Sequence, residues 1–149
     1  MRIAVVINTS WNIYNFRQGL VKKLLEEGHQ VIAIAPEDEF SKHLIEWGCE
    51  FLPLKMQNKG TNPISDFFLF FRFCKLYKQS KAEVFLQYTI KPNIYGTLAA
   101  NWLNKKSVCN VSGLGTVFLN PEKLSSKIAF LLYKFAFKFP KRVFFQNSD

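Results

Sequence analysis

The sequence is poor in the side chains that build disulfide frameworks and zinc sites. It holds only three cysteines and two histidines among 149 residues, without CxxC spacing or a cluster of potential metal ligands. We therefore expect no bound metal, and free buried thiols in a reducing compartment. These residues are Cys49, Cys74, Cys109, His29 and His43.

Long hydrophobic runs are also missing. No uncharged apolar stretch reaches the roughly 18 residues of a membrane-spanning helix. The apolar start at residues 3–7 is too short for a signal peptide. We therefore expect a cytoplasmic protein. An apolar content of 48% and a charged content of 21% are ordinary for a globular chain, and the length suits one domain with a sizeable core.

Glycine is absent from residues 8–17, where a dinucleotide-binding fold would carry G-x-G-x-x-G after its first strand. Without glycine, the backbone cannot turn tightly and approach a pyrophosphate, so a nicotinamide or flavin site is not expected. The segment offers Ser10, Trp11, Asn15 and Arg17, a mixture that binds sugars by hydrogen bonds and ring stacking. It is equally consistent with a capping turn that has Asn15 as the N-cap of the next helix.

Strand-length apolar runs alternate with segments of helical period along the whole chain. The runs are rich in Val, Ile and Phe without polar alternation, which favours a parallel sheet covered on both faces. Six strands with intervening helices predict an α/β fold, a Rossmann-like doubly wound sheet, over residues 1–149. The last strand is followed by no helix, which suggests that a further domain follows. Expected strands are 3–7, 31–35, 51–54, 84–87, 108–111 and 143–145, and expected helices 16–27, 40–47, 64–79, 92–103 and 124–139.

Two loops follow strands of this predicted sheet, at residues 88–93 and 112–116. Loops at the carboxyl ends of parallel strands line one crevice, where ligands bind. In the first loop, Lys91 beside Pro92 and the free N–H groups of a helix start would bind an anion; a solvated lysine is the alternative. In the second, Gly113 and Gly115 would expose backbone N–H groups to a ligand, unless this is an ordinary turn.

Carboxylates are few near this crevice. Glu37, Asp38 and Glu39 follow the second strand, and Asp149 ends the chain. Asp38 or Glu37 could serve as a general base, although a solvated helix start explains them as well.

Positive charge is concentrated in the second part of the chain. Residues 1–54 hold 5 basic and 7 acidic side chains, and residues 55–149 hold 15 basic and 4 acidic ones. Two helical wheels place basic residues beside outward-facing aromatic residues, a pattern typical of a surface that lies on anionic lipid. The alternative is a solvated lysine face whose rings are covered by another domain. No motif supports nucleic-acid binding. The basic residues are Arg72, Lys75, Lys78, Lys127, Lys134 and Lys138.

The same wheels predict which apolar residues face the core. On the helix from residue 64, the predicted inward residues are Leu69, Phe70, Phe73, Leu76 and Tyr77, and the outward ones Ile64, Phe68 and Phe71. On the helix from residue 124, the predicted inward residues are Leu124, Ile128, Leu131, Leu132, Phe135 and Phe139, and the outward ones Phe130, Tyr133 and Phe137.

Taken together, these segments resemble the N-terminal domain of bacterial family 4 glycosyltransferases of the GT-B fold, in the branch that builds capsular and other surface polysaccharides. The resemblance implies a two-domain, retaining hexosyltransferase without a metal. Its N-terminal half would receive a lipid-linked acceptor at the inner face of the cell membrane. A C-terminal domain, absent from this chain, would hold most of the nucleotide-sugar, so residues 1–149 alone should be inactive. The matching stretches are 8–17, 33–38, 88–96, 111–116 and 143–147.

The resemblance also suggests roles for individual residues. Many relatives place a histidine in a cleft loop, but the corresponding loops here have none. Thr89, Lys91, Ser112 or Thr116 could take over its role, and the candidate catalytic residues are Thr89 and Lys91. The candidate acceptor contacts are Ser10, Trp11, Asn15, Arg17, Tyr88 and Asn93, and the candidate donor-phosphate contacts are Gly113, Gly115 and Thr116. Two alternatives stay open: a non-catalytic membrane-docking or scaffolding module, and a sugar-nucleotide epimerase of similar shape.

Overall fold

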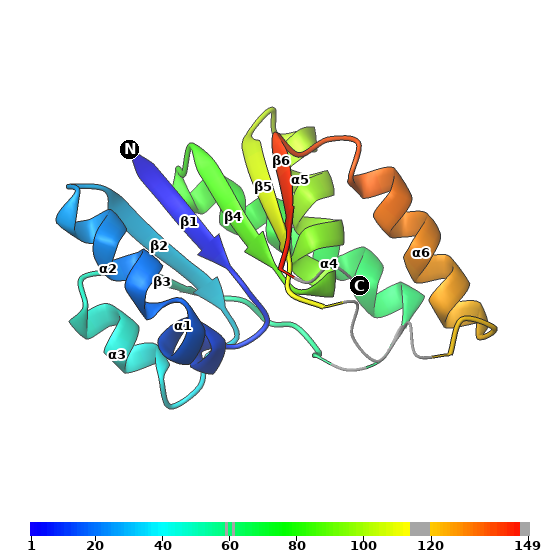
Figure 1. The fold of residues 1–149 in the computed structure, drawn as a ribbon, viewed down its shortest axis with the longest axis horizontal. Helices are drawn as coiled ribbons and strands as arrows, with labels where there is room; N and C mark the ends of the chain where they lie inside the picture. Colours follow the sequence, from blue (N-terminus) through cyan, green and yellow to red (C-terminus); the bar gives the residue numbers. More distant parts are fainter. Residues whose placement is uncertain (59, 61, 114–119, 147–149) are drawn as a thin grey trace.

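The structure is a computed structural model that describes residues 1–58, 60, 62–113 and 120–146. Its centre is a six-stranded sheet in the order β3-β2-β1-β4-β5-β6, in which all neighbouring strands are parallel. This confirms the predicted doubly wound α/β architecture (Figure 1). The strands are β1 (Arg2–Val6), β2 (Gln30–Ala35), β3 (Glu50–Pro53), β4 (Val84–Tyr88), β5 (Lys106–Val111) and β6 (Arg142–Phe145).

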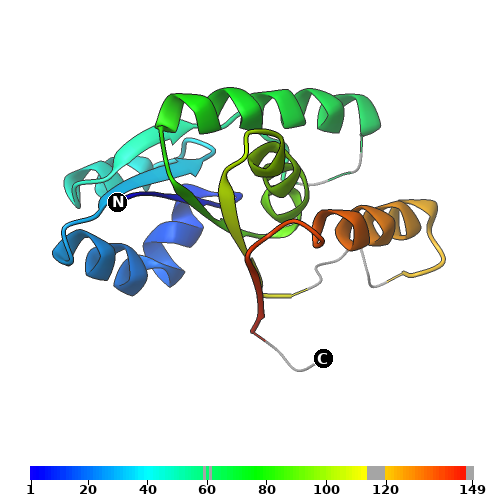
Figure 2. The same cartoon turned by 90° about the horizontal axis from the view of Figure 1, so that it is seen from above.

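Helices cover both faces of the sheet, and Figure 2 shows α2 and α4 on opposite sides of it. One core lies between the sheet and α1, α2 and α3, and the other lies between the sheet and α4 and α5. Because both faces are covered, strands such as β1 and β2 are apolar at nearly every position. The helices are α1 (Ser10–Phe16), α2 (Gln18–Glu26), α3 (Ser41–Glu46), α4 (Pro63–Ser80), η1 (Pro92–Gly96), α5 (Thr97–Trp102) and α6 (Leu124–Ala136).

The chain becomes helical earlier after β1 than the sequence suggested. Thr9 caps α1, because its Oγ1 accepts a hydrogen bond from the backbone N–H of Asn12 at 3.1 Å. Asn15 does not cap α2, since its side chain donates to the carbonyl of Trp11 one turn back, at 2.9 Å. The predicted sugar-binding loop is therefore mostly helix, and the prediction of Asn15 as an N-cap was wrong.

The helix α4 is oriented as the wheel predicted. Leu69, Phe73 and Tyr77 are buried against the sheet, whereas Ile64, Phe68 and Phe71 are exposed. The basic side chains on its outer face are exposed as well. Among them Arg72 donates to the carbonyl of Lys55 at 3.1 Å, which ties the helix to the preceding loop.

The helix α6 shows a different face from the one predicted. Its buried residues are Ser126, Ala129, Tyr133 and Ala136, which follow each other at intervals of three and four positions. Small residues at this spacing allow α6 to approach closely the turn formed by η1, and Ala136 packs with Ile94 there. The prediction ranked side chains by apolar size and therefore chose the wrong stripe.

Several individual predictions for α6 consequently change. Tyr133 is buried and Phe137 partly buried, although both were predicted to face outward. Phe130, Lys127, Lys134 and Lys138 are exposed as predicted. The predicted inward residues that are instead exposed are Leu124, Ile128, Leu131 and Phe135.

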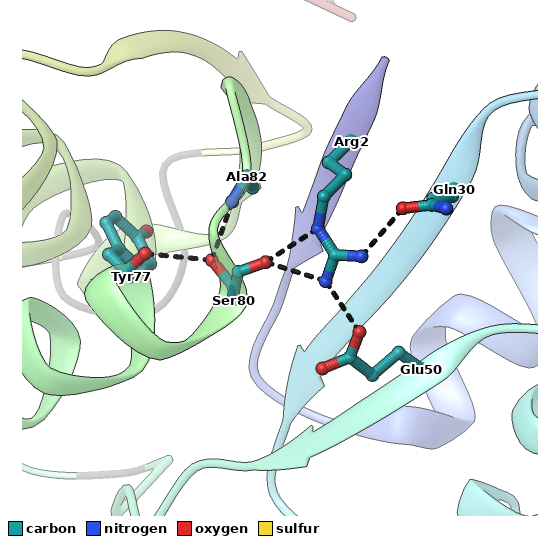
Figure 3. A network of polar contacts seen from close by, with 6 residues as sticks. All are labelled: Arg2, Gln30, Glu50, Tyr77, Ser80 and Ala82. Carbon is teal, nitrogen blue, oxygen red and sulfur yellow. Dashed lines mark hydrogen bonds and ion pairs between the residues drawn. The ribbon is translucent and has the colours of Figure 1, made fainter.

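At the amino end of the sheet, Arg2 joins three strands to the end of α4 (Figure 3). Its guanidinium donates to Gln30 Oε1 and Glu50 Oε2, each at 2.7 Å, and to the Ser80 carbonyl at 2.8 and 3.0 Å. The planar donor fork of arginine suits such multiple acceptors. This cluster fixes the end of the sheet opposite the candidate site.

Candidate functional site

A cavity of about 1090 Å³ lies at the carboxyl ends of the strands. Figure 1 shows the arrowheads of β1, β4 and β5 directed toward this edge of the sheet. The segments after these three strands contribute Asn8, Lys91 and Gly113 to a single cavity wall, although they are far apart in sequence. The remaining walls come from the loop after β3, the start of α4, and α6. This is the crevice that the strand pattern predicted.

Most of the cavity wall is apolar. Phe67 and Pro63 line it from α4, and Ile128 and Leu132 line it from α6. Half of the polar side chains on the wall come from the segments after β4 and β5. The polar residues are Asn8, Asn58, Asp66, Thr89, Lys91, Tyr95, Ser112 and Ser125. A cavity with this distribution suits a ligand that is polar at one end and apolar at the other.

Lys91 does not project freely into solvent. Its Nζ donates to Asp66 Oδ1 at 2.9 Å, and only 13% and 8% of the two side chains are exposed. The hydroxyl of Tyr95 donates to the other carboxylate oxygen, Oδ2, at 3.1 Å. Burial and the neighbouring Asp66 raise the pKa of Tyr95 well above its usual value, so the phenol stays protonated.

Asp66 was missed by the sequence reasoning, which searched for carboxylates only in loops after strands. It lies in the first turn of α4, where Asn62 caps the helix and Pro63 follows. An acidic residue at that position is ordinarily explained by the helix dipole. The sequence did contain one signal for Asp66: acidic residues are rare in this part of the chain, with only four among residues 55–149.

Thr89 has an unusual backbone at the end of β4. Its φ of 68° lies in the left-handed region, which threonine rarely adopts. Its hydroxyl is buried and has no hydrogen-bond partner among the described residues. Strained conformations and unpaired buried groups of this kind concentrate at functional sites. Thr89 also lines the cavity.

The segment after Thr89 forms the wide helical turn η1, which continues directly into α5. Wide turns of this type are rare and frequently occur at functional sites. Asn93, on this turn, is fully buried and donates through Nδ2 to the carbonyl of Asn110 at 3.0 Å. Asn93 therefore joins η1 to β5. Because it is fully buried and does not line the cavity, it is not available as a contact for a sugar acceptor.

A buried polar network supports this turn from below. Gln87 donates to the hydroxyl of Tyr77 at 2.8 Å and accepts from the hydroxyl of Thr97 at 2.6 Å. Gly96 lies against this network, since a Cβ added there would be 2.5 Å from the Tyr77 hydroxyl and 2.6 Å from Gln87 Nε2. Cys109 belongs to the same cluster, and burial raises the pKa of its thiol to about 11.

The residues predicted between positions 10 and 17 are distributed over α1 and its ends. Ser10 is fully buried, donating to the Pro36 carbonyl at 3.0 Å and lying 2.9 Å from the hydroxyl of Ser41. It fixes α1 to the segment before α3 and is not available to a ligand. Trp11 is 45% exposed, and Asn15 is also exposed.

Arg17 connects α1 to the end of β4. Its guanidinium lies over the Tyr88 ring at 4.5 Å from the ring centre. Burial raises the pKa of the Tyr88 hydroxyl, and the charge of Arg17 partly lowers it again. Because Tyr88 directly precedes Thr89, this contact stabilises the strand end beside the cavity.

The remaining predictions concern Asp38 and the loop after β5. Asp38 accepts hydrogen bonds from the backbone N–H groups of Trp11 and Phe40 at 3.0 and 2.9 Å, so its carboxylate has a capping role. Gly113 lines the cavity, and among the described residues no atom beyond its chain neighbours lies within 4 Å of a Cβ built there. Gly115 and Thr116 lie outside the described residues.

The described part of the chain lacks two features. It contains no grouping of three or more His, Cys, Asp or Glu side chains arranged to hold a metal ion. Nor does any helix in this part combine the length and apolar content needed to cross a bilayer.

Comparison with known sequences gives one family and one curated relative. A family model described as "Glycosyl transferase 4-like" matches residues 2–147. The N,N'-diacetylbacillosaminyl-diphospho-undecaprenol alpha-1,3-N-acetylgalactosaminyltransferase of Campylobacter jejuni is 28% identical over 153 residues. The match covers all of this chain and 41% of that relative, so the chain spans about two fifths of the relative's length.

Solved structures of other proteins share this fold. MurG of Acinetobacter baumannii superposes with a TM-score of 0.64 at 16% identity, over 96% of this chain and 40% of MurG. A UDP-N-acetylglucosamine 2-epimerase superposes with a TM-score of 0.67 at 16% identity, over 99% of this chain and 42% of the epimerase. At this identity the likeness shows the fold alone.

Proposed function

Because this chain belongs to the glycosyl transferase 4-like family, we propose that it is the acceptor-binding part of a glycosyltransferase. The enzyme transfers a sugar from a nucleotide-sugar to a lipid-linked saccharide, in the synthesis of capsular or other surface polysaccharide. The donor is held mainly by a second domain, in keeping with the greater length of the Campylobacter relative. The family predicted from sequence motifs is confirmed.

The observation that carries this proposal is the cavity at the carboxyl ends of the strands. It combines an apolar wall from α4 and α6 with Lys91 and Thr89 at the strand ends. A lipid diphosphate-linked sugar has the same two parts, an apolar chain and a charged head. The name of the Campylobacter relative specifies an acceptor of that type. An epimerase acting on a free nucleotide-sugar has no need of the apolar wall.

In the proposed reaction, an acceptor hydroxyl oxygen bonds to the anomeric carbon while the bond from that carbon to the donor diphosphate breaks. The proton of the acceptor hydroxyl passes to the departing diphosphate. Transfer through a cationic sugar depends on holding both substrates in place and on stabilising developing charge. In this scheme Lys91 and Thr89 orient the acceptor head. Gly113 presents backbone to the donor phosphates, and Arg17 supports the end of β4 through its contact with Tyr88.

Incubating the full-length protein with a radiolabelled nucleotide-sugar and a bacterial lipid extract tests the proposal. We expect the label to enter the organic-solvent phase only when both lipid and protein are present. Conversion of the free nucleotide-sugar without lipid would instead identify an epimerase, and an absence of either reaction with any donor would support a non-catalytic module.

We also propose that the protein binds peripherally to the inner face of the cell membrane through the α4–α6 surface. We define this surface by its exposed apolar residues, which are between 45% and 73% exposed. They flank the cavity, and exposed lysines of α6 lie among them, the pattern of an interfacial surface on anionic lipid. The residues are Ile64, Phe67, Phe68, Phe71, Leu124, Ile128, Phe130, Leu131 and Phe135.

Replacing Lys127, Lys134 and Lys138 together with alanine should weaken binding to anionic liposomes by roughly 100-fold. Each lysine near such a surface contributes about 1 kcal/mol, so three contribute roughly 3 kcal/mol. Flotation of the full-length protein with vesicles containing phosphatidylglycerol measures the effect.

The matched control replaces Lys22, Lys23 and Lys42 with alanine. These lysines are also exposed, but they belong to α2 and α3 across the sheet, so the same loss of charge should leave flotation nearly unchanged. Equal loss in the two triple variants would mean that net charge, rather than the α4–α6 surface, controls binding. Normal flotation of the α6 variant would rule out its lysines as lipid contacts.

A further inference from the structure

Asp66, Lys91 and Tyr95 form a cluster on the cavity wall, in which the buried Asp66 is the centre and Lys91 and Tyr95 are partly buried. One carboxylate oxygen accepts from the Lys91 ammonium and the other from the Tyr95 hydroxyl. Asp66 comes from α4, whereas its two partners come from the segment that follows β4. The cluster therefore links the two elements between which the cavity opens.

Stability alone does not account for this cluster. Removing two opposite charges from water costs several kcal/mol per ion, and apolar residues of similar size often serve the fold equally well. The cluster lies where a fixed ammonium has a chemical use, because all three of its residues line the cavity. An ammonium has three N–H donors, and one is directed to Asp66.

We propose that Asp66 and Tyr95 are positioning residues that hold the Lys91 ammonium against the cavity wall, with its other N–H groups available to the acceptor diphosphate. This inference rests on the proposed transferase function. Asp66 restricts the long lysine side chain, and Tyr95 restricts Asp66. The entropy cost of ordering the lysine is thus met on folding and not on substrate binding.

The geometry argues against Asp66 as a general base. Both of its oxygens already accept hydrogen bonds, and its side chain is only 8% exposed. A base must reach the proton that it removes, directly or through one water. The positioning role requires only the contacts that the structure shows.

Substituting Asp66→Asn in the full-length protein separates these roles. The change keeps the shape but removes the charge that fixes Lys91. We expect kcat to fall about tenfold while KM for the lipid acceptor stays the same or decreases, because the site becomes more positive. Tyr95→Phe should lower kcat about threefold. Glu27→Gln breaks an exposed ion pair with Lys23 on α2 and should leave both constants unchanged.

The decisive comparison repeats Asp66→Asn in a Lys91→Met background. Residues that act through one another are not additive, so Asp66→Asn should change kcat less than twofold there. A full tenfold further loss would overturn the positioning role. A loss above a thousandfold in both backgrounds would identify Asp66 as a base and also overturn it. If Asp66→Asn does not fold, Tyr95→Phe in both backgrounds provides the same comparison.

Binding of inorganic pyrophosphate, measured by calorimetry, gives a readout independent of transfer. We expect Lys91→Met to bind pyrophosphate more weakly than the native protein. Tyr95→Phe should show a smaller loss of affinity, and Glu27→Gln should show no loss. If these affinity losses were found in a protein that transfers no sugar, they would support the positioning of the Lys91 ammonium, and the proposed transferase function would be contradicted. Identical pyrophosphate affinity in the native, Lys91→Met and Tyr95→Phe proteins would overturn the inference.

Discussion

Replacing Lys91 with alanine should lower the turnover of the full-length transferase at least tenfold. The ammonium is the only cation of the β4 loop on the cavity wall, within the part of the chain that the structure describes. Without it, the acceptor diphosphate loses a charge-assisted contact, and such contacts are about twice as strong as neutral hydrogen bonds. Steady-state kinetics with a lipid-linked acceptor measure the loss, expressed per folded molecule.

The same substitution also leaves the Asp66 carboxylate buried without its ammonium partner. Breaking a buried pair typically costs about 3–5 kcal/mol, whereas replacing both partners with apolar residues is often neutral. The double variant Lys91→Met, Asp66→Leu, which roughly keeps the two side-chain volumes, should therefore be much more stable than Lys91→Ala but recover none of the turnover. Recovery of turnover together with stability would show that Lys91 serves the fold and not the reaction.

Replacing Gly96 with alanine should destabilise the protein by about 2–3 kcal/mol, a typical cost of overfilling a packed site. The added methyl group would overlap the Tyr77 hydroxyl and the Gln87 amide. Both belong to the fully buried network beneath η1 and have little room to move. Thermal unfolding measures the change, with about 2–4 °C expected for each kcal/mol.

Gly19→Ala is the matched control for Gly96→Ala. Gly19 lies in α2, and in the described part of the chain no atom beyond its chain neighbours and its own helix backbone would be within 4 Å of its added Cβ. Alanine is the better helix former, so this variant should be as stable as the native protein or slightly more so. Removing the Tyr77 hydroxyl by Tyr77→Phe should partly restore the Gly96→Ala variant. An unchanged midpoint in Gly96→Ala would show that the network yields easily.

The strands could be predicted from sequence because burial on both faces leaves an unbroken apolar run, as in β1 and β2. The position of Lys91 and Gly113 on one cavity wall followed from the parallel topology alone, because their loops leave the carboxyl ends of neighbouring strands. Asn15, which the sequence also suggested for this site, is not among the lining residues. The start of the first helix was harder to predict, because the sequence offers two possible N-cap residues close together. Thr9 and Asn15 are both acceptable helix caps, and only the structure shows that Thr9 is used.

The remaining errors have a common physical origin. On α6, side-chain size favoured Leu131 and Phe135 as core residues, but close approach to η1 favoured Ala129 and Ala136. Asp66 could not be joined to Lys91 from sequence, because 25 residues and a strand separate them. Periodicity describes one element at a time, whereas both of these features depend on how two elements meet.

The number of residues in the wide turn η1 sets which side chain faces the cavity. A regular helix advances by 100° per residue, so deletion of one residue within Pro92–Gly96 would rotate everything before the deletion relative to α5. Lys91 would then leave its place beside Asp66. The length of this turn thus works as a spacer, and it belongs to the site as much as the residues that line the cavity.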